Sequence, residues 1–403
     1  MPFLQLNFST YDSELLFQQN VNQCLSRLHL PTFLINALFD LRKPNCNSTK
    51  AWKQLLYGLH VAFVLLLLIV VIGILLLEPY SIIRYDPLRS SIYVVLAAYF
   101  IKLQGFLSVL FLMAWNFRAR TSIFQSLLME TSGASVLRKT RNLRSVNYVT
   151  ISYNVFRVLL IVGISILRKL HADNEFEKYD SNEVLSWSIT GAIVFNGLLC
   201  GLSHLAATSQ VFIHTCIVGN EFTILAEDLR SDSNSCQLPV IKHYVSAYKN
   251  NLRLYKSIHW YVGLWVNLQL CFSFVQLFYI VSIIDIFMSW PELAINLILL
   301  LDSMITSLMH GLLIAKLHRS FDALPKSILN LAVSGKLLDE GTYSLINTFI
   351  AYVQQKHCRL YFVVGYFKVS VRLLIRIYVL VVVIVFWARF QSDSVLIRLE
   401  EIN

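Results

Sequence analysis

The chain has 403 residues, of which 56% are hydrophobic and 14% are charged, and its mean hydropathy is +0.59. A soluble domain has roughly a quarter of its residues charged, so this composition excludes an ordinary soluble protein. The net charge of +10 is compatible with nucleic-acid binding, but a membrane protein carries the same excess as Lys and Arg in its cytoplasmic loops, and we expect no nucleic-acid partner.

Seven apolar stretches are each long enough to cross the ~30 Å hydrocarbon layer as a helix. They lie near 54–77, 91–115, 148–167, 184–207, 260–288, 293–315 and 360–388. Only helices and closed barrels satisfy their backbone hydrogen bonds in lipid, and none of these stretches has the alternation of a barrel strand. We therefore predict an all-α polytopic membrane protein with a seven-helix transmembrane domain over 54–388.

The charges between the spans predict the orientation of the chain. Segments 116–147 and 316–359 are rich in Lys and Arg, whereas acidic residues outnumber basic ones in 168–183. Basic loops stay on the cytoplasmic side. The N-terminal segment 1–53 falls on that side, and seven spans then place the short tail 389–403 outside. We expect a multi-pass protein of the plasma membrane.

Two cytoplasmic segments, 219–258 and 316–359, are too long to be simple turns and are predicted to extend the helices below the bilayer. Apolar residues recur in them at helical spacing. The first segment has Tyr244, Tyr248, Leu252 and Tyr255, and the second has Leu324, Ile328, Leu331, Leu345, Ile346, Phe349 and Tyr352. These faces are expected either to form an intersubunit core in the cytosol or to be solvated amphipathic surfaces.

Several polar side chains fall inside the predicted spans, where an ionisable group is costly and is a functional candidate by default. They are Lys102, Gln104, Arg157, Asn196, His204, Asn267, Gln269, Gln276, Asp285, Asp302 and His310. The alternative is that each forms an interhelical hydrogen bond that holds the bundle together, worth ~0.6 kcal/mol. Lys102, Arg157 and Asp302 lie at similar depth, and a charge pair among them would cost less than isolated charges.

A small-molecule site is predicted from the polar residues and aromatic residues in the outer halves of the spans. A pocket with an apolar wall and few polar anchors is typical of such sites. The candidate ligand-binding residues are Tyr99, Lys102, Arg157, Trp187, Asn196, Gln276 and Tyr279. The aromatic residues among them are equally expected from packing and from the aromatic belt at the membrane interface.

The segment Gly365–Phe390 reads GYFKVSVRLLIRIYVLVVVIVFWARF and resembles the last helix of insect gustatory receptors. Gly365 and Phe367 match the small residue and aromatic residue that open the family motif, and Leu374, Arg376 and Ile377 match its L-h-[KR]-I element. An apolar run from 384 to 388 and a closing Phe390 follow. Two departures stand out: Val382 and Val383 replace the family's Thr-Tyr pair, and Arg389 replaces its Gln.

The resemblance implies a chemosensory receptor that is a tetrameric, ligand-gated, non-selective cation channel opened by a small-molecule tastant. It also implies a homo- or hetero-tetramer with other gustatory receptor subunits. The seventh helix would line the pore, so that Val382, Val383, Phe386 and Arg389 are the candidate pore residues. Phe386 and Arg389 are also consistent with an aromatic belt and an arginine that reaches the headgroups.

No enzymatic chemistry is expected, because the sequence has no phosphate-binding Gly-rich loop, no H-E-x-x-H and no G-x-S-x-G. The cysteines follow no zinc-binding spacing, and we expect neither a metal nor a cofactor. Two alternatives remain: a non-conducting receptor of the same fold, or a secondary transporter. Transporters commonly show internal repeats and helices broken near mid-membrane, and neither feature is evident in the sequence.

Overall fold

The computed structural model describes residues 11–40, 51–85, 89–131, 134–176, 183–232, 237–283, 290–333, 339–354, 361–362, 367–368, 370, 372–384 and 387. Its long helices are α3 (Ala51–Tyr85), α4 (Arg89–Phe117), α7 (Thr140–Phe176), α8 (Glu183–Ser231), α9 (Leu238–Ile283) and α10 (Trp290–Phe321). The shorter ones are α1 (Tyr11–His29), η1 (Leu30–Thr32), α2 (Phe33–Leu38), α5 (Arg120–Thr131), α6 (Ala134–Arg138), α11 (Ala323–Val333) and α12 (Glu340–Gln354). A further helix covers 372–384.

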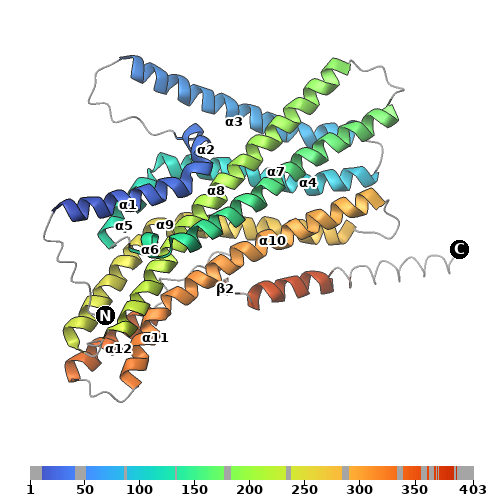
Figure 1. Ribbon diagram of the computed structural model, residues 1–403. Coiled ribbons are helices and arrows are strands. Elements are labelled where there is room, and N and C mark those ends of the chain that lie inside the picture. Colours follow the sequence, from blue (N-terminus) through green and yellow to red (C-terminus); the bar gives the residue numbers. More distant parts are fainter. Residues whose placement is uncertain are drawn as a thin grey trace.

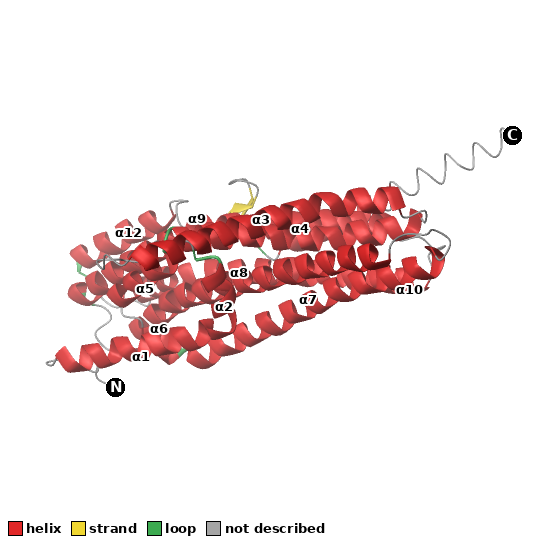
Figure 2. Cartoon of the chain, turned by 90° about the horizontal axis from the view of Figure 1, so that it is seen from above, coloured by secondary structure: helices red, strands yellow, loops and turns green. Residues whose placement is uncertain are grey.

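The long helices form an elongated bundle, with α5, α6, α11 and α12 gathered toward one end (Figures 1 and 2). Within the described part of the chain, six helices are long and apolar enough to cross a membrane. These six correspond to the first six predicted spans. Helix α3 is the least enclosed, since only 17% of its apolar window is buried, so most of its surface is left for lipid or for another chain.

Small residues on α8 let two neighbouring helices approach closely. A Cβ at Gly197 would lie 2.8 Å from Ile161 Cγ2, and one at Gly201 would lie 2.7 Å from Val158 Cγ2, both on α7. On another face of α8, a Cβ at Gly105 of α4 would lie 2.7 Å from the Cys200 carbonyl oxygen. Such G-x-x-x-G contacts are a main source of helix association in membranes, where lipid removes the hydrophobic driving force.

The helical extensions over 219–258 and 316–359, predicted to be cytoplasmic, pack against one another within the same chain. Tyr248 contacts Phe222 with ring centroids 4.9 Å apart and Phe349 at 5.1 Å, and Tyr255 contacts Phe321 at 4.8 Å. These rings come from α8, α9, α10 and α12, and edge-to-face geometry adds to the burial of their area. The face expected to meet another subunit or solvent is therefore buried inside this one chain, because the paired extensions enclose it.

The N-terminal segment contributes to the bundle, although no element was predicted in it. Val21, Leu25 and Leu28 of α1 are buried, and Asn147 Nδ2 donates to the Leu28 carbonyl oxygen at 2.9 Å. Although His29 is partly exposed as a residue, its ring centroid lies 5.4 Å from that of His214. Desolvation lowers the pKa of His29 to about 4, so its ring is neutral at physiological pH.

The seventh predicted span, 360–388, is not helical from its start, and it is not among the six helices long and apolar enough to cross a membrane in the described part of the chain. Tyr361–Phe362 and Phe367–Lys368 form an antiparallel strand pair, so the prediction of a helix from residue 360 is wrong there. Aromatic and β-branched residues favour strands. The same residues are apolar, so a strand rich in them can be mistaken in the sequence for the start of a membrane helix. Ser370 Oγ accepts a hydrogen bond from the Leu373 N–H at 3.2 Å and caps the helix that follows.

The helix over 372–384, red in Figure 1, packs along α10. Leu374 fills the space above Gly311, where a Cβ would lie 3.1 Å from the Leu374 Cγ. The Tyr378 hydroxyl contacts Ser307 Oγ and donates to the Met304 carbonyl oxygen at 3.2 Å. Ile375, Val379, Leu380, Val382 and Val383 are exposed. One side of this helix is thus fixed to α10, and the other side is uncovered. The uncovered side is apolar toward residue 384 and carries the exposed Arg372 and Arg376 at its start.

Candidate functional site: a buried polar network

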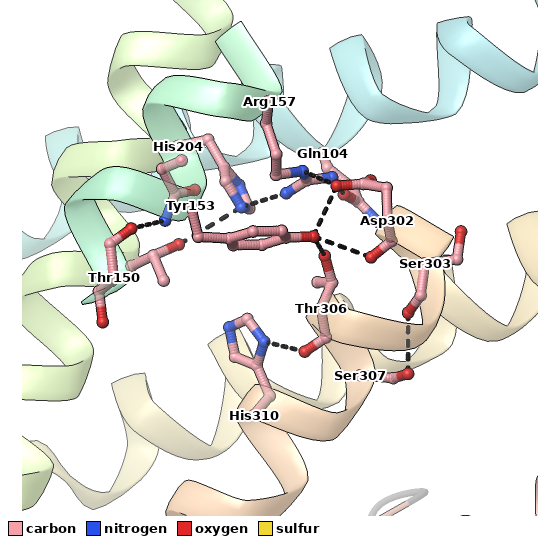
Figure 3. A network of polar contacts seen from close by, with 12 residues as sticks. Gln104, Thr150, Tyr153, Arg157, His204, Asp302, Ser303, Thr306, Ser307 and His310 are labelled. Atoms are coloured by element: carbon pink, nitrogen blue, oxygen red, sulfur yellow. Dashed lines mark hydrogen bonds and ion pairs between the residues drawn. The ribbon is translucent and has the colours of Figure 1, made fainter. Parts of the chain in front are cut away.

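The centre of the bundle holds an ion pair between α7 and α10 (Figure 3). Arg157 Nε lies 2.9 Å from Asp302 Oδ1, although its N–H is not directed at that oxygen. Both side chains are almost fully buried, at 3% and 0% exposure. A buried charge without a partner is strongly unfavourable, so the two residues need each other. The charge pair anticipated among Lys102, Arg157 and Asp302 thus forms between the last two.

Further polar groups on α4 and α8 surround the Arg157 guanidinium. Its Nη2 donates to Gln104 Oε1 at 2.7 Å, and its Nη1 lies 2.6 Å from His204 Nε2. The other ring nitrogen of His204 lies 3.1 Å from Ser108 Oγ. Because an arginine only donates, Nε2 must be the acceptor and Nδ1 carries the proton, which it donates to Ser108. The histidine is therefore neutral in this arrangement.

Tyr153 connects the ion pair to the next turn of α10. Its hydroxyl lies 2.6 Å from Asp302 Oδ1 and 2.9 Å from Thr306 Oγ1 (Figure 3). A carboxylate only accepts, so the tyrosine donates to Asp302 and accepts from Thr306. One connected network thus joins α4, α7, α8 and α10.

The candidate ligand-binding residues divide into several groups. Arg157 belongs to the network. Lys102 and Asn196 are buried, and the Lys102 Cε is 3.8 Å from where a Cβ at Gly197 would stand, so it lies beside the helix turn that carries Asn196. Tyr279 has its ring centroid 5.8 Å from that of Phe100. These residues lie on different helices that meet inside the bundle, as a shared pocket would require.

The other candidates are placed differently. The Tyr99 hydroxyl donates to the Leu75 carbonyl oxygen on α3 at 2.8 Å, which ties two helices together. Gln276 is fully buried on α9. The backbone of Trp187 lies in α8, but its side chain is outside the described part of the molecule. Val382 and Val383 are exposed, whereas Phe386 and Arg389 lie outside the described residues.

A line of polar groups on α9 continues the polar interior beyond the network. Gln269 and Ser273, one turn apart, are buried, and within the described part of the chain neither the Gln269 amide atoms nor the Ser273 hydroxyl has a hydrogen-bond partner. Buried polar atoms normally have a protein or water partner. This line is therefore suited to hold ordered water or the polar groups of a bound molecule.

Some members of the network were not predicted from the sequence, because the prediction considered only ionisable and amide side chains within the apolar spans. Tyr153, Ser108 and Thr306 are ordinary residues for a membrane helix. Helical spacing gives the missing signal: Tyr153 is four residues before Arg157, and Thr306 is four residues after Asp302. Residues four apart share a helix face, so hydroxyl groups at these positions point at the same partners.

The sequence matches no protein-family model, and it matches no curated protein. Solved structures do resemble it. A structure of the insect olfactory receptor OR5 from Machilis hrabei superposes with a TM-score of 0.62 at 10% identity, covering 92% of this chain and 98% of that one. The structure of the same receptor in complex with eugenol gives a TM-score of 0.57 at 11% identity, covering 93% and 99%. The chain therefore has the fold of an insect olfactory receptor along nearly its whole length.

Proposed function

We propose that this protein is a chemosensory receptor of the gustatory type, acting as one subunit of a tetrameric, ligand-gated cation channel in the plasma membrane. The observation that carries the proposal is the likeness in fold to an insect olfactory receptor over more than nine-tenths of both chains. The gustatory type is inferred from the residues of the last helix that resemble that family, from Gly365 to Phe390.

The binding of a small molecule is proposed for the interior between α4, α7, α8, α9 and α10. One of the similar structures is the Machilis hrabei receptor in complex with eugenol, which is a small molecule. In the present chain the interior offers Lys102, Asn196 and Tyr279 together with the polar line at Gln269 and Ser273. Few polar anchors in an apolar surrounding are typical of small-molecule sites. We infer a neutral or weakly polar tastant.

The pore is proposed to lie along the uncovered side of the helix over 372–384. Polar contacts to α10 hold one side of this helix, and the other side exposes Val382 and Val383. Four copies around an axis would cover this surface and line the passage beside Val382 and Val383 with apolar side chains, whereas the exposed Arg372 and Arg376 lie nearer its other end. A constriction of this kind gates by excluding water.

The proposal is tested by expressing this chain alone in cells and recording membrane current during application of a panel of sugars, bitter compounds and small aromatic alcohols. We expect a cation current that follows the ligand and is absent from untransfected cells. Subunit counting by stepwise photobleaching of a fluorescent fusion should give four steps. If a ligand binds but no current appears, whether or not gustatory co-subunits are co-expressed, the non-conducting receptor is favoured. If the ligand is taken up by the cells without current, the transporter is favoured.

A further inference from the structure

The cytoplasmic half of α9 carries an exposed stripe of basic residues. Lys242, Lys249, Arg253 and Lys256 are all exposed, and their spacing of seven, four and three residues places them on one face of the helix. Trp260 continues the same face one turn later and is 71% exposed. Exposed tryptophan is typical of the membrane–water interface. The stripe thus runs from the edge of the bilayer into the aqueous phase.

A cavity of about 190 Å³ opens on this stripe, between α9 and α12. Its lining consists of Lys249, Leu252, Arg253, Lys256 and Tyr352. The Tyr352 ring of α12 forms one wall, with the Lys249 Nζ 5.8 Å from its centroid. The volume is several times the ~30 Å³ that a water molecule occupies in the liquid. The cavity therefore has room for an anionic group held by three cations.

The helix segments that line the cavity contain no acidic side chain that could neutralise these charges. The sequence of α9 from Leu238 to Ile283 contains no Asp or Glu, and neither does the sequence from 341 to 392. In the described part of the chain the basic residues of ion pairs are Arg138, Lys139 and Arg157, none of which lines this cavity. Three like charges converging on one cavity repel one another unless an anion lies between them.

The depth of the cavity indicates what kind of anion fits. At 1.5 Å per residue, Lys256 lies ~6 Å and Lys249 ~16 Å along the helix axis from Trp260. The headgroup layer of one leaflet is roughly 5–7 Å thick. The nearer cation is thus at headgroup depth and the farther one lies beyond it, as required for a headgroup whose extra phosphates project from the membrane.

We propose that this cavity binds a ligand with several phosphate groups, and that the ligand is a phosphoinositide headgroup of the cytoplasmic leaflet. Basic pockets at the cytoplasmic edge of membrane helices have the right charge for such headgroups. The inference goes beyond the proposed function and needs from it only the orientation that places α12 in the cytosol. The bound headgroup would contact both α9 and α12. Because α12 precedes the proposed pore helix in the chain, the headgroup would connect α9 to the part of the chain that leads into the pore.

The test measures binding of a short-chain phosphatidylinositol bisphosphate to the purified full-length protein in detergent, with short-chain phosphatidylcholine as the reference lipid. The test variant is Lys249→Gln/Arg253→Gln/Lys256→Gln. The matched control is Lys316→Gln/Arg319→Gln/Lys326→Gln, which removes the same charges from exposed positions on α10 and α11. We expect affinity to fall about a hundredfold in the test variant, from about a fivefold contribution of each of the three cations, and to change little in the control.

Free inositol trisphosphate is the second ligand measured. Weaker binding of the free headgroup than of the lipid supports the membrane source, and equal binding keeps the polyphosphate site but assigns it to a soluble ligand. Equal losses in test and control variants would overturn the site and leave only non-specific attraction to charge. A change in subunit number in the test variant would also overturn it, because the stripe would then be an interface between copies. The binding test needs no channel activity, so its failure can be told apart from a failure of the proposed channel function.

Discussion

At the scale of single residues, the ion pair between Arg157 and Asp302 is a condition for placing either charge inside the bundle. Each partner offsets the desolvation of the other, and Gln104, His204 and Tyr153 add hydrogen bonds to the pair. Removing one partner leaves a buried charge, which is more harmful than removing both.

The variant Asp302→Asn is expected to lower the free energy of unfolding by about 3 kcal/mol, because Arg157 then stays charged without its counter-ion. The double variant Arg157→Met/Asp302→Leu should lose clearly less, since no charge remains. Thermal unfolding of the detergent-purified protein measures both. The control Lys139→Gln breaks an ion pair with Glu227 that is largely exposed, and it should change stability by less than about 1 kcal/mol. A double variant less stable than Asp302→Asn would contradict this account.

At the scale of elements, close packing of α8 on α7 depends on positions where a methyl group does not fit. Gly197 and Gly201 lie against Ile161 and Val158. Both partners are β-branched, so they have little freedom to move aside. In contrast, a Cβ at Gly191 on the same helix would meet nothing within 4 Å.

The variant Gly197→Ala/Gly201→Ala is therefore expected to destabilise the protein by about 1–3 kcal/mol through overpacking. The control Gly191→Ala should have no effect or raise stability slightly, because alanine favours the helix more than glycine does. Unfolding temperature in detergent distinguishes the two. Adding Val158→Ala to Gly201→Ala should restore part of the loss; the absence of any rescue would show that the contact is not the cause.

The helix over 372–384 gives a prediction about the pore. Single Cys replacements at Val382, Val383, Phe386 and Arg389 are expected to give periodic block of the ligand-evoked current by external thiol reagents. Leu76→Cys on α3 is the control, since Leu76 is 69% exposed on the helix with the least enclosed surface. Its current should be insensitive. Uniform insensitivity of all four positions in a conducting channel would move the pore elsewhere.

At the scale of the whole molecule, the orientation in the membrane remains a prediction from the charge distribution. Asn7-Phe8-Ser9 and Asn47-Ser48-Thr49 are glycosylation sequons in the segment proposed to be cytoplasmic. Both should remain unmodified in cells. The double substitution Asp180→Asn/Asn182→Thr creates a sequon between α7 and α8, and this one should be used. A mobility shift removed by glycosidase reports each case, and a glycan at Asn47 in the natural chain would reverse the orientation.

Hydrophobicity and helical spacing predict much of this molecule from its sequence, because lipid and backbone hydrogen bonding leave helices as the main option. The first six spans follow from these rules, and so does the helical spacing of Tyr244, Tyr248, Leu252 and Tyr255. The burial of that face inside the chain does not follow from them, since the same spacing suits a contact with another chain or with solvent. The strand pair at 361–368 does not, since an apolar run suits a strand as well as a helix. The polar network was predicted in part: burial of charge indicated Arg157 and Asp302, but hydroxyl partners such as Tyr153 depend on which helices meet.

Helix α8 is continuous over 49 residues, from Glu183 to Ser231. At 1.5 Å per residue it is ~74 Å long, more than twice the hydrocarbon thickness of ~30 Å. Its closest contacts with α4 and α7 lie at Gly197, Cys200 and Gly201, ~24 Å from one end of the helix and ~48 Å from the other. If the helix pivots at these contacts, a tilt of about 5° moves its two ends by ~2 Å and ~4 Å. A ligand that changed the angle near Asn196 would thus displace the aromatic contacts of Phe222 at the far end of the bundle without any bending of the helix.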